Sequence, residues 1–119
     1  MNTRYRSIYI TARDAAEAEK IGRALVNEKL VACVNYFPVK SIYRWKGKIE
    51  EEGEVALIAK TRAARVERLI ERVKELHSYE VPCVVSWPIE KGNPDFLEWV
   101  EKETEEAPGN QKSKVKTQK

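Results

Sequence analysis

The 119-residue chain contains few of the residues that build cross-linked or metal-clustered proteins. It has two cysteines, Cys33 and Cys83, and one histidine, His77. Two cysteines are too few for a disulfide scaffold, and their spacing matches no zinc-binding pattern. No apolar run approaches the roughly 20 residues of a membrane span, and no apolar segment typical of a secretory signal follows the N-terminal MNTRYRS. We therefore expect a cytoplasmic protein without a membrane partner.

Sequence signatures of enzymes are also lacking. The chain carries no nucleophilic serine motif and no glycine-rich loop that would cradle a phosphate. Glu50, Glu51 and Glu52 are consecutive, which is typical of a solvated acidic run rather than of a catalytic pair. Such a run binds hard cations only loosely at the surface. We expect that the protein is not an enzyme.

The positive charge of the chain is concentrated at one end. The formal net charge is +3, but the last acidic residue is Glu106, and four lysines follow it at positions 112, 114, 116 and 119. Without these lysines the body is slightly acidic, so the high pI does not indicate nucleic-acid binding. The composition predicts one domain over residues 1–106 and a basic, flexible tail over residues 107–119.

Hydrophobic periodicity predicts alternating strands and helices. Ile8, Ile10 and Ala12 alternate with polar residues, as on a strand, and Asp14 followed by Glu17 has the spacing of a helix-capping pair. The same reasoning predicts a helix through position 25, extended segments over 30–45 and 55–59, a helix over 62–76, a strand over 81–87 and a short helix after position 93. This β-α-β-β-α-β order predicts an α+β, ferredoxin-like fold with an added C-terminal helix.

The strand order 4-1-3-2 of a ferredoxin-like sheet leads to two further expectations. The segment over residues 55–59 is apolar on both faces, so it should lie centrally and be covered twice. The strands that carry Cys33 and Cys83 should lie at opposite edges, about 14 Å apart. This separation excludes a disulfide or shared metal coordination between the two thiols within one chain.

The segment from Tyr36 to Leu57 is predicted to form an overlong hairpin that turns at Lys46-Gly47-Lys48. Pro38 cannot donate to a strand ladder, so we expect either a bulge or an edge strand that changes partner midway. An isolated two-stranded arm with exposed aromatic residues is a liability, and pairing with a second subunit would remove it. The alternative is a single-chain core with aromatic residues on its surface.

Six segments stand out by their order and spacing: Ala32-Cys33-Val34-Asn35, residues 41–49 (SIYRWKGKI), Lys60-Thr61, residues 77–82 (HSYEVP), Gly92-Asn93 and Leu97-Glu98-Trp99. Together they resemble the CutA family of divalent-cation-tolerance proteins. The resemblance implies a ferredoxin-like fold, a PII-like homotrimer built by long β-hairpin arms, and a role in tolerance of copper and other divalent cations. It leaves open an alternative role as a PII-like signalling protein that binds a small regulatory ligand in the cleft between subunits.

Thiolate and imidazole groups suit copper, so Cys33 and His77 are the candidate metal ligands. In some bacterial CutA proteins, copper binding is attributed to a cysteine in the first strand and two histidines that end the second helix. The corresponding positions here hold Ile10, Leu76 and His77. Only His77 matches, so we expect no required cofactor and at most weak binding of copper or another divalent cation. Alternatively, His77 forms helix-end hydrogen bonds and Cys33 is a small buried side chain.

A second set of residues predicts a ligand cleft. Lys60 ends a strand, Tyr79 and Glu80 precede the last strand, and Tyr43 and Trp45 lie on the hairpin that is expected to reach a neighbour. In a trimer these residues would combine cationic, acidic and aromatic groups, which is typical of a small-ligand site. The alternatives are that the aromatic residues only pack at an interface and that Lys60 pairs with an acid of a neighbouring subunit.

An RNA-binding module is the other class of protein that this fold suggests. Such a module needs stacking aromatic residues on its two central strands. The central positions taken from the periodicity are Ile8, Ile10, Leu57 and Ala59, which offer none. We therefore expect no nucleic-acid partner.

Overall fold

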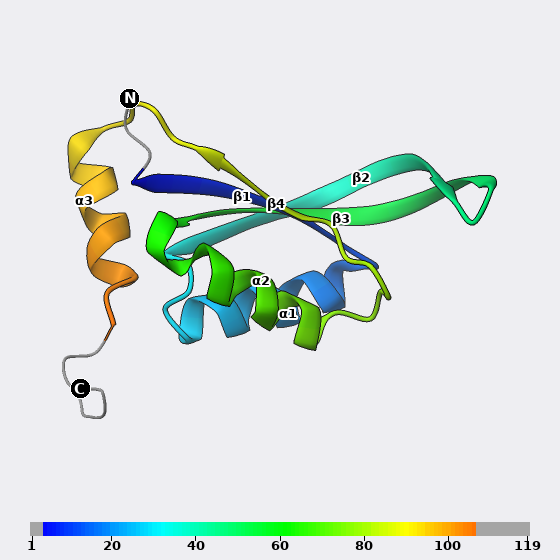
Figure 1. Cartoon of the computed structure of the whole chain (residues 1–119), viewed down its shortest axis with the longest axis horizontal. Coiled ribbons are helices and arrows are strands. Elements are labelled where there is room, and N and C mark those ends of the chain that lie inside the picture. The colour runs from blue at the N-terminus through cyan, green and yellow to red at the C-terminus, as the bar shows by residue number, and fades with distance from the viewer. Residues whose placement is uncertain (1–3, 107–119) are drawn as a thin grey trace.

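Residues 4–106 of the computed structural model form a four-stranded antiparallel sheet with two helices on one face and a third helix at one end (Figure 1). The elements in chain order are β1 (Tyr5–Ala12), α1 (Ala15–Asn27), β2 (Cys33–Trp45), β3 (Lys48–Arg62), the 3₁₀ turn η1 (Ala63–Arg65), α2 (Val66–Leu76), β4 (Val84–Pro88) and α3 (Pro94–Glu103). The sheet order is β2-β3-β1-β4, which confirms the α+β, ferredoxin-like prediction. No helix in this part of the chain is long and apolar enough to cross a membrane. The tail predicted at 107–119 lies outside the described residues.

The first helix begins as its sequence predicts. The Asp14 side chain accepts a hydrogen bond from the backbone N–H of Glu17 at 2.9 Å, which satisfies one of the free donors at the start of α1. The Glu17 carboxylate in turn accepts from the N–H of Arg13 at 2.8 Å. These bonds fix the direction in which the chain leaves β1 and enters α1.

The main core lies between the sheet and the pair formed by α1 and α2. Ile8 and Ile10 of β1, Leu57 and Ala59 of β3 and Ile21 of α1 are fully buried there. The helix face of α1 approaches the sheet closely at Gly22, where a Cβ atom would lie 3.4 Å from Cγ1 of Val34. The alternating residues of each strand therefore divide into a helix-covered face and an open face.

Two expectations were wrong because of the face of the sheet opposite α1 and α2, which we call the open face. Strand β3 is central, as predicted, but over residues 55–59 helices cover only one of its faces, because α1 and α2 both pack on the same side (Figure 1). Helix α3 covers only the end of the other face, where Leu97 and Val100 pack against Tyr5. Ile8, Ile10, Leu57 and Ala59 all belong to the covered face, so they say nothing about RNA stacking on the open one. The reason given against an RNA-binding module was wrong, and the absence of a nucleic-acid partner stays a prediction.

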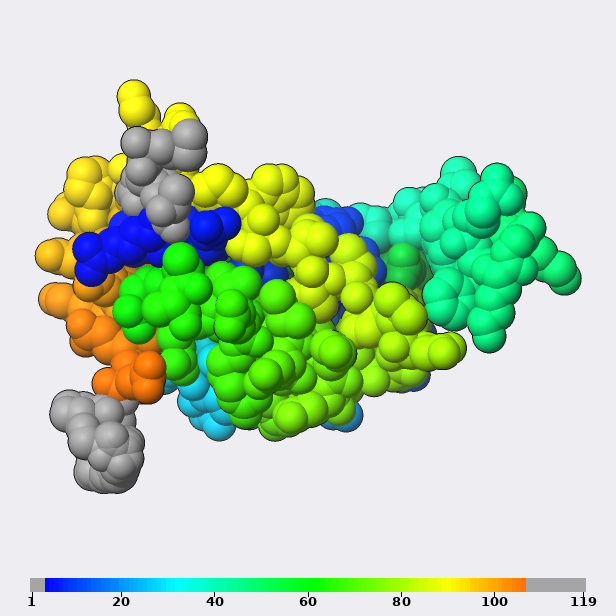
Figure 2. All heavy atoms as spheres, viewed as in Figure 1, coloured from blue at the N-terminus to red at the C-terminus, as the bar shows by residue number. Residues whose placement is uncertain are grey.

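Strands β2 and β3 continue far beyond the rest of the sheet. Strand β1 pairs with β3 only from Val55 to Arg62, so residues 39–54, which we call the arm, form a ribbon of two strands. The radius of gyration of 15.6 Å exceeds the value of about 13 Å for a compact domain of this size. Figure 2 shows the arm projecting from the body.

The arm turns at Lys46 and Gly47, whose φ angles of 50° and 82° are both positive. This two-residue turn matches the twist of the flanking strands, and the pair Trp45–Lys48 closes it. The predicted hairpin turn is thus confirmed.

The prediction of a bulge or a change of partner at Pro38 was wrong. Pro38 aligns with Val55, and the register from Cys33–Lys60 to Trp45–Lys48 contains no break. Because β2 is an edge strand, alternate N–H groups of its backbone face away from β3, and a proline at such a position removes no ladder bond.

The last strand is shorter than its apolar pattern suggested. It begins at Val84, whereas residues 81–83 form an irregular segment that leads from α2 into β4. Pro82 has no N–H to offer a neighbouring strand, which is consistent with this later start. The irregular segment crosses beside the base of the arm.

Candidate functional site

A hollow of about 860 Å³ begins where the arm leaves the sheet and follows the arm as far as Trp45, beside its turn. We call it the arm-base hollow. Its walls come from β1, from both strands of the arm and from the segment between α2 and β4. Four of the five residues predicted to line a ligand cleft are in its lining, namely Tyr43, Trp45, Tyr79 and Glu80. Residues that lie far apart in the sequence therefore line one hollow within a single chain.

The acidic side of the arm-base hollow comes from alternate residues of β3. Glu50, Glu52 and Glu54 share one strand face and line the hollow. The hydroxyl of Tyr43 donates to Oε1 of Glu52 at 2.7 Å, and the hydroxyl of Tyr79 donates to Oε2 of Glu54 at 2.7 Å. Tyr43 thus bonds to a carboxylate of the neighbouring strand on the same face of the arm, and Tyr79 bonds to the arm from the segment between α2 and β4.

These contacts shift the pKa of both phenols upward. The hydrogen bond to Glu52, together with partial burial and the charges of Glu54 and Glu50, raises the pKa of Tyr43 to about 12. Burial first, and then the bond to Glu54, raises the pKa of Tyr79 as well. Both hydroxyls therefore keep their protons at neutral pH and act as hydrogen-bond donors.

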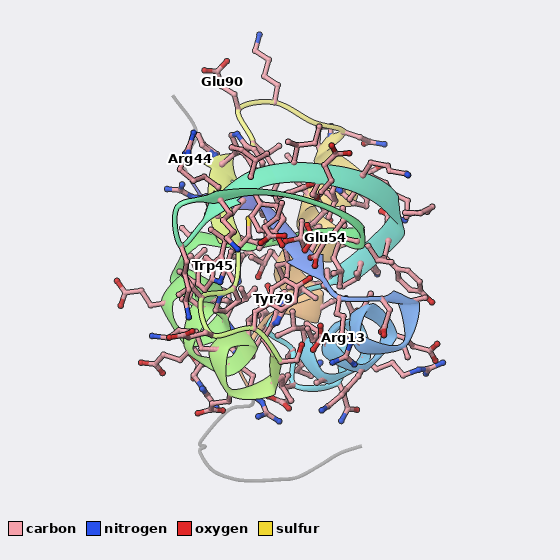
Figure 3. The ribbon with its side chains drawn as sticks, turned by 90° about the vertical axis from the view of Figure 1, so that its right-hand side faces the viewer. Arg13, Arg44, Trp45, Glu54, Tyr79 and Glu90 are labelled. Carbon is pink, nitrogen blue, oxygen red and sulfur yellow. The ribbon has the colours of Figure 1, made fainter. Side chains whose placement is uncertain are left out.

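Glu54 is the most deeply placed acid of the hollow. Only 8% of the residue is exposed, and its carboxylate contacts the hydroxyl of Tyr79 but no cationic side chain among residues 4–106. Figure 3, which looks along the arm, shows Glu54 and Tyr79 near the centre of the view. The sequence analysis did not select Glu54; its signal was the two-residue alternation of glutamates that leads into the apolar part of β3.

His77 positions the segment that carries Tyr79. Its Nε2 lies 2.7 Å from the backbone oxygen of Thr11, and its Nδ1 lies 3.1 Å from the backbone nitrogen of Tyr79. Because the Tyr79 N–H can only donate, Nδ1 accepts and Nε2–H donates to Thr11. The side chain is fully buried. Both ring nitrogens are engaged, so a metal ion at His77 would have to replace one of these bonds.

Glu17 supports the same turn from the start of α1. Its Oε2 accepts from the N–H of Ser78 at 2.8 Å, while Oε1 accepts from Arg13. Burial alone would raise the pKa of Glu17, but these N–H donors outweigh burial and hold the pKa below its usual range. The capping residue of the first helix therefore also anchors the segment that follows the second.

The two candidate metal ligands lie apart. Cys33 aligns with Lys60, which aligns with Ser7, whereas His77 contacts Thr11 at the other end of β1. Four residues of strand correspond to about 13 Å. Within the described range 4–106, no group of three or more histidine, cysteine, aspartate or glutamate residues is placed to hold a metal ion. The roles of Cys33 and His77 as metal ligands stay predictions.

Lys60 and Cys83 also differ from expectation. Lys60 shares a strand face with Glu54 but lies six residues further along β3, so it does not line the arm-base hollow. Cys83 does line it, although it was considered only as a possible thiol ligand. Burial is the main cause that raises the pKa of the Cys83 thiol, and the charge of Glu54 adds to it. A hydrogen bond with Thr11 lowers the pKa but does not cancel this rise. The thiol therefore stays protonated at neutral pH.

Comparison with known proteins places the chain in a family. The sequence profile described as "CutA1 divalent ion tolerance protein" matches residues 6–103. The divalent-cation tolerance protein CutA of Archaeoglobus fulgidus is 47% identical over 98 residues, which cover 82% of this chain and 96% of that protein. The human protein CutA is 44% identical over 98 residues. That match covers 82% of this chain but only 55% of the human protein.

Solved structures agree with the sequence relatives. The structure described as the periplasmic divalent cation tolerance protein CutA from Archaeoglobus fulgidus has a TM-score of 0.83 and 46% identity, and the match covers 85% of this chain and 99% of that one. CutA1 from Oryza sativa has a TM-score of 0.84 and 36% identity over 89% of this chain and 98% of that one. On both the sequence and the structural match, the chain belongs to the CutA1 divalent ion tolerance protein family.

Proposed function

We propose that this protein acts in divalent-cation tolerance as a non-enzymatic, cytoplasmic homotrimer, with copper among the ions to which it responds. The observation that carries the proposal is the arm, because two strands extend beyond the sheet without a third strand to support them. A two-stranded ribbon is at best marginally stable in water. A second copy of the chain that pairs with the arm would stabilise it, and three copies is the number that the CutA resemblance implies.

Exposed apolar side chains on the arm support this assembly. Ile42 and Ile49 lie near the tip of the arm and are 70% and 59% exposed. The outer edge of β2 also presents backbone groups that pair with no strand among residues 4–106, since β3 is the one neighbour of β2 in this part of the chain. A long, exposed, apolar edge strand is a template for pairing with another chain.

The open face of the sheet provides a second apolar surface. Trp87 and Val85 of β4 are about half exposed, at 50% and 47%, and Phe37 of β2 lies on the same face. The Trp87 ring packs edge-on against Tyr9, with 6.0 Å between ring centroids. Apolar patches of this kind mark protein contacts more often than free surface, so copies of the chain that share the arms would also cover this face.

A growth experiment tests the proposed role. A host that lacks its own CutA gene is grown at rising copper concentration, with and without this chain. We expect the chain to raise the copper concentration that halves growth. A variant with Ile42→Asp and Ile49→Asp, which should disrupt the arm contacts, is expected to lose this effect, whereas the exposed control Lys74→Ala keeps it. Equal tolerance with and without the chain would contradict the proposal.

Copper binding by the purified protein is a separate question. Since both nitrogens of His77 are used in hydrogen bonds, we expect at most weak Cu(II) binding there. Titration followed by calorimetry measures the affinity directly. Tight stoichiometric binding that Cys33→Ser or His77→Ala abolishes would show that these residues do form a copper site.

The arm-base hollow favours a second candidate function, the binding of a small regulatory ligand in the manner of a signalling protein. Its volume of about 860 Å³ lies in the range of small-ligand pockets, and four residues predicted for a ligand cleft line it. A panel of small ions and metabolites, read by thermal shift of the full chain, tests this function. No shift with any compound would favour a packing role for Tyr43 and Trp45.

A further inference from the structure

The charge of the arm-base hollow differs from what its predicted residues suggested. An anionic ligand would be expected if Lys60 lined it, but Lys60 lies well away along β3. The charged lining instead consists of four carboxylates, Glu50, Glu52, Glu54 and Glu80, and one ammonium group, that of Lys40. Close carboxylates with little counter-charge create a negative potential that attracts cations and repels phosphates.

Glu54 gives this potential a specific focus. The residue is more than nine-tenths buried, yet the hydrogen-bond partner of its carboxylate is the neutral hydroxyl of Tyr79, and no ion pair with a residue in the 4–106 range compensates its charge. An ionised carboxylate can accept about four hydrogen bonds. A buried carboxylate with a single neutral donor is costly, and a bound cation would lower that cost.

Aromatic rings complete the lining on the arm side. Tyr43 and Trp45 both border the hollow and are more than one-third exposed. The Trp45 ring already attracts a cation, because Nζ of Lys46 lies 5.6 Å from its centroid. Rings of this kind bind alkylammonium and guanidinium groups through their faces and cover the apolar part of such ligands. Trp45 pairs with Lys48, six residues along β3 from Glu54, so it borders the end of the hollow nearest the turn of the arm.

We propose that the arm-base hollow binds a small organic cation that carries ammonium or guanidinium groups, with Glu54 as the principal charge partner. The inference rests on the second candidate function, since it names the ligand class for the same site. A long molecule with two or more separated cationic groups and an apolar spacer fits best, because the carboxylates follow one another along β3 and the rings stand beside them on β2. Glu80 on the segment before β4 supplies a second anchor.

Calorimetric titration of the full-length protein tests the inference. Spermidine and agmatine serve as cationic probes, inorganic phosphate and ATP as anionic probes, and magnesium chloride as a simple divalent cation. We expect spermidine or agmatine to bind at one site per chain, and phosphate and ATP not to bind. Glu54→Gln removes the buried charge with little change of shape, and we expect it to weaken binding by about tenfold or more.

Two further variants keep the test decisive. Glu80→Gln alters an exposed residue of the same lining, so it measures the effect of charge even if Glu54→Gln impairs folding; we expect a weaker but clear loss. Glu90→Gln is the matched control, because Glu90 is an exposed glutamate that Figure 3 shows far from the hollow. Binding by the Glu90→Gln variant should equal that of the wild type. Equal loss in Glu90→Gln and Glu54→Gln would overturn the assignment to this site.

The remaining outcomes distinguish a wrong ligand class from a failure of the second candidate function. Binding of phosphate or ATP without binding of the cations would overturn the ligand class but keep a ligand site. Binding of magnesium with the same Glu54 dependence, and of neither amine, would also overturn it. No binding by any probe would overturn the inference, and the second candidate function would fall with it only if the wider thermal-shift panel also gave no shift. A last variant carries Arg44→Gln and Lys46→Gln, which remove two positive charges from the tip of the arm. If the amines bind only to this variant, a cationic side chain of a neighbouring copy fills the hollow in the wild type. That result would overturn the proposal that a free ligand binds there.

Discussion

Single side chains hold the segment after α2 in place. His77 contacts the backbone of β1 and of Tyr79, Glu17 contacts the backbone of Ser78, and the Tyr79 hydroxyl contacts Glu54 on the arm. These bonds join the end of one helix, the start of another and the base of the arm. The wall of the arm-base hollow that carries Tyr79 and Glu80 therefore depends on a few hydrogen bonds, whereas its other walls are strands.

His77→Ala should destabilise the protein. The substitution leaves the Thr11 carbonyl and the Tyr79 N–H without their partners, so we expect the free energy of unfolding to fall by about 2–3 kcal/mol. Urea denaturation at one fixed protein concentration measures the change, because assembly contributes to apparent stability. Lys74→Ala, an exposed substitution on the preceding helix, should change stability by less than about 0.5 kcal/mol. Comparable effects of the two changes would rule out an anchoring role for His77.

Tyr43 predicts a pH dependence at the alkaline end. Its hydrogen bond to Glu52 raises the pKa of the folded-state phenol from 10.0 to about 12. The contribution of this phenol to stability is therefore complete below pH 10 and is lost as pH rises to about 12. We expect the difference in urea midpoint between wild type and Tyr43→Phe to be constant from pH 7 to 9 and to vanish near pH 12. Tyr36→Phe serves as control, and a difference that grows with pH would contradict this assignment.

At the scale of elements, periodicity and capping signals explain most of the fold. The alternation around Ile8 and Ile10 predicted β1, the Asp14–Glu17 spacing predicted the start of α1, and Lys46-Gly47 predicted the turn of the arm; all three are confirmed. These signals are local, so a single sequence contains them. The wrong prediction at Pro38 had a different source. Whether a proline interrupts a strand depends on whether its nitrogen faces a neighbouring strand or the open edge. The pairing with β3 decides which of the two applies, and this pairing is not a local signal.

The candidate site was predictable only in part for the same reason. Tyr43, Trp45, Tyr79 and Glu80 were selected from their residue types and their places near the arm, and they do line one hollow. Lys60 was included because it ends a strand, but its distance from the hollow follows from the register of β1 and β3. Glu54 was missed because the alternation of glutamates shows which of them share a face but not that Tyr79, 25 residues further along the chain, contacts this one.

Gly22 gives a test of how closely α1 packs on the sheet. A Cβ atom at this position would lie 3.4 Å from Val34 and 3.8 Å from Leu57, which is ordinary contact distance. Glycine weakens a helix by about 0.8–1 kcal/mol relative to alanine. We expect Gly22→Ala to raise the free energy of unfolding by roughly 0.5 kcal/mol and Gly22→Val to lower it, since the larger side chain would overpack the contact. Denaturation of both variants measures this, and a loss of more than about 1 kcal/mol in Gly22→Ala would show that the contact tolerates no added atom.

At the scale of the whole molecule, one feature separates this chain from a compact α+β domain. The body has a covered core, whereas the arm and the open face of the sheet expose apolar residues such as Ile42, Ile49 and Trp87. The two surfaces are linked, because β3 runs from the open face directly into the arm. In the proposed trimer, one association would cover both surfaces and stabilise the base of the arm, where the hollow lies.

The solution mass of the full chain tests this assembly most directly. Light scattering at low micromolar concentration is combined with circular dichroism on the same sample, so that mass and folding are measured together. The Ile42→Asp, Ile49→Asp variant, which weakens the arm contacts, should show a lower mass at equal concentration. For the wild type we expect a folded species of three times the 13.8 kDa chain mass. A well-folded wild-type species of 13.8 kDa would contradict the proposal that a second copy completes the arm.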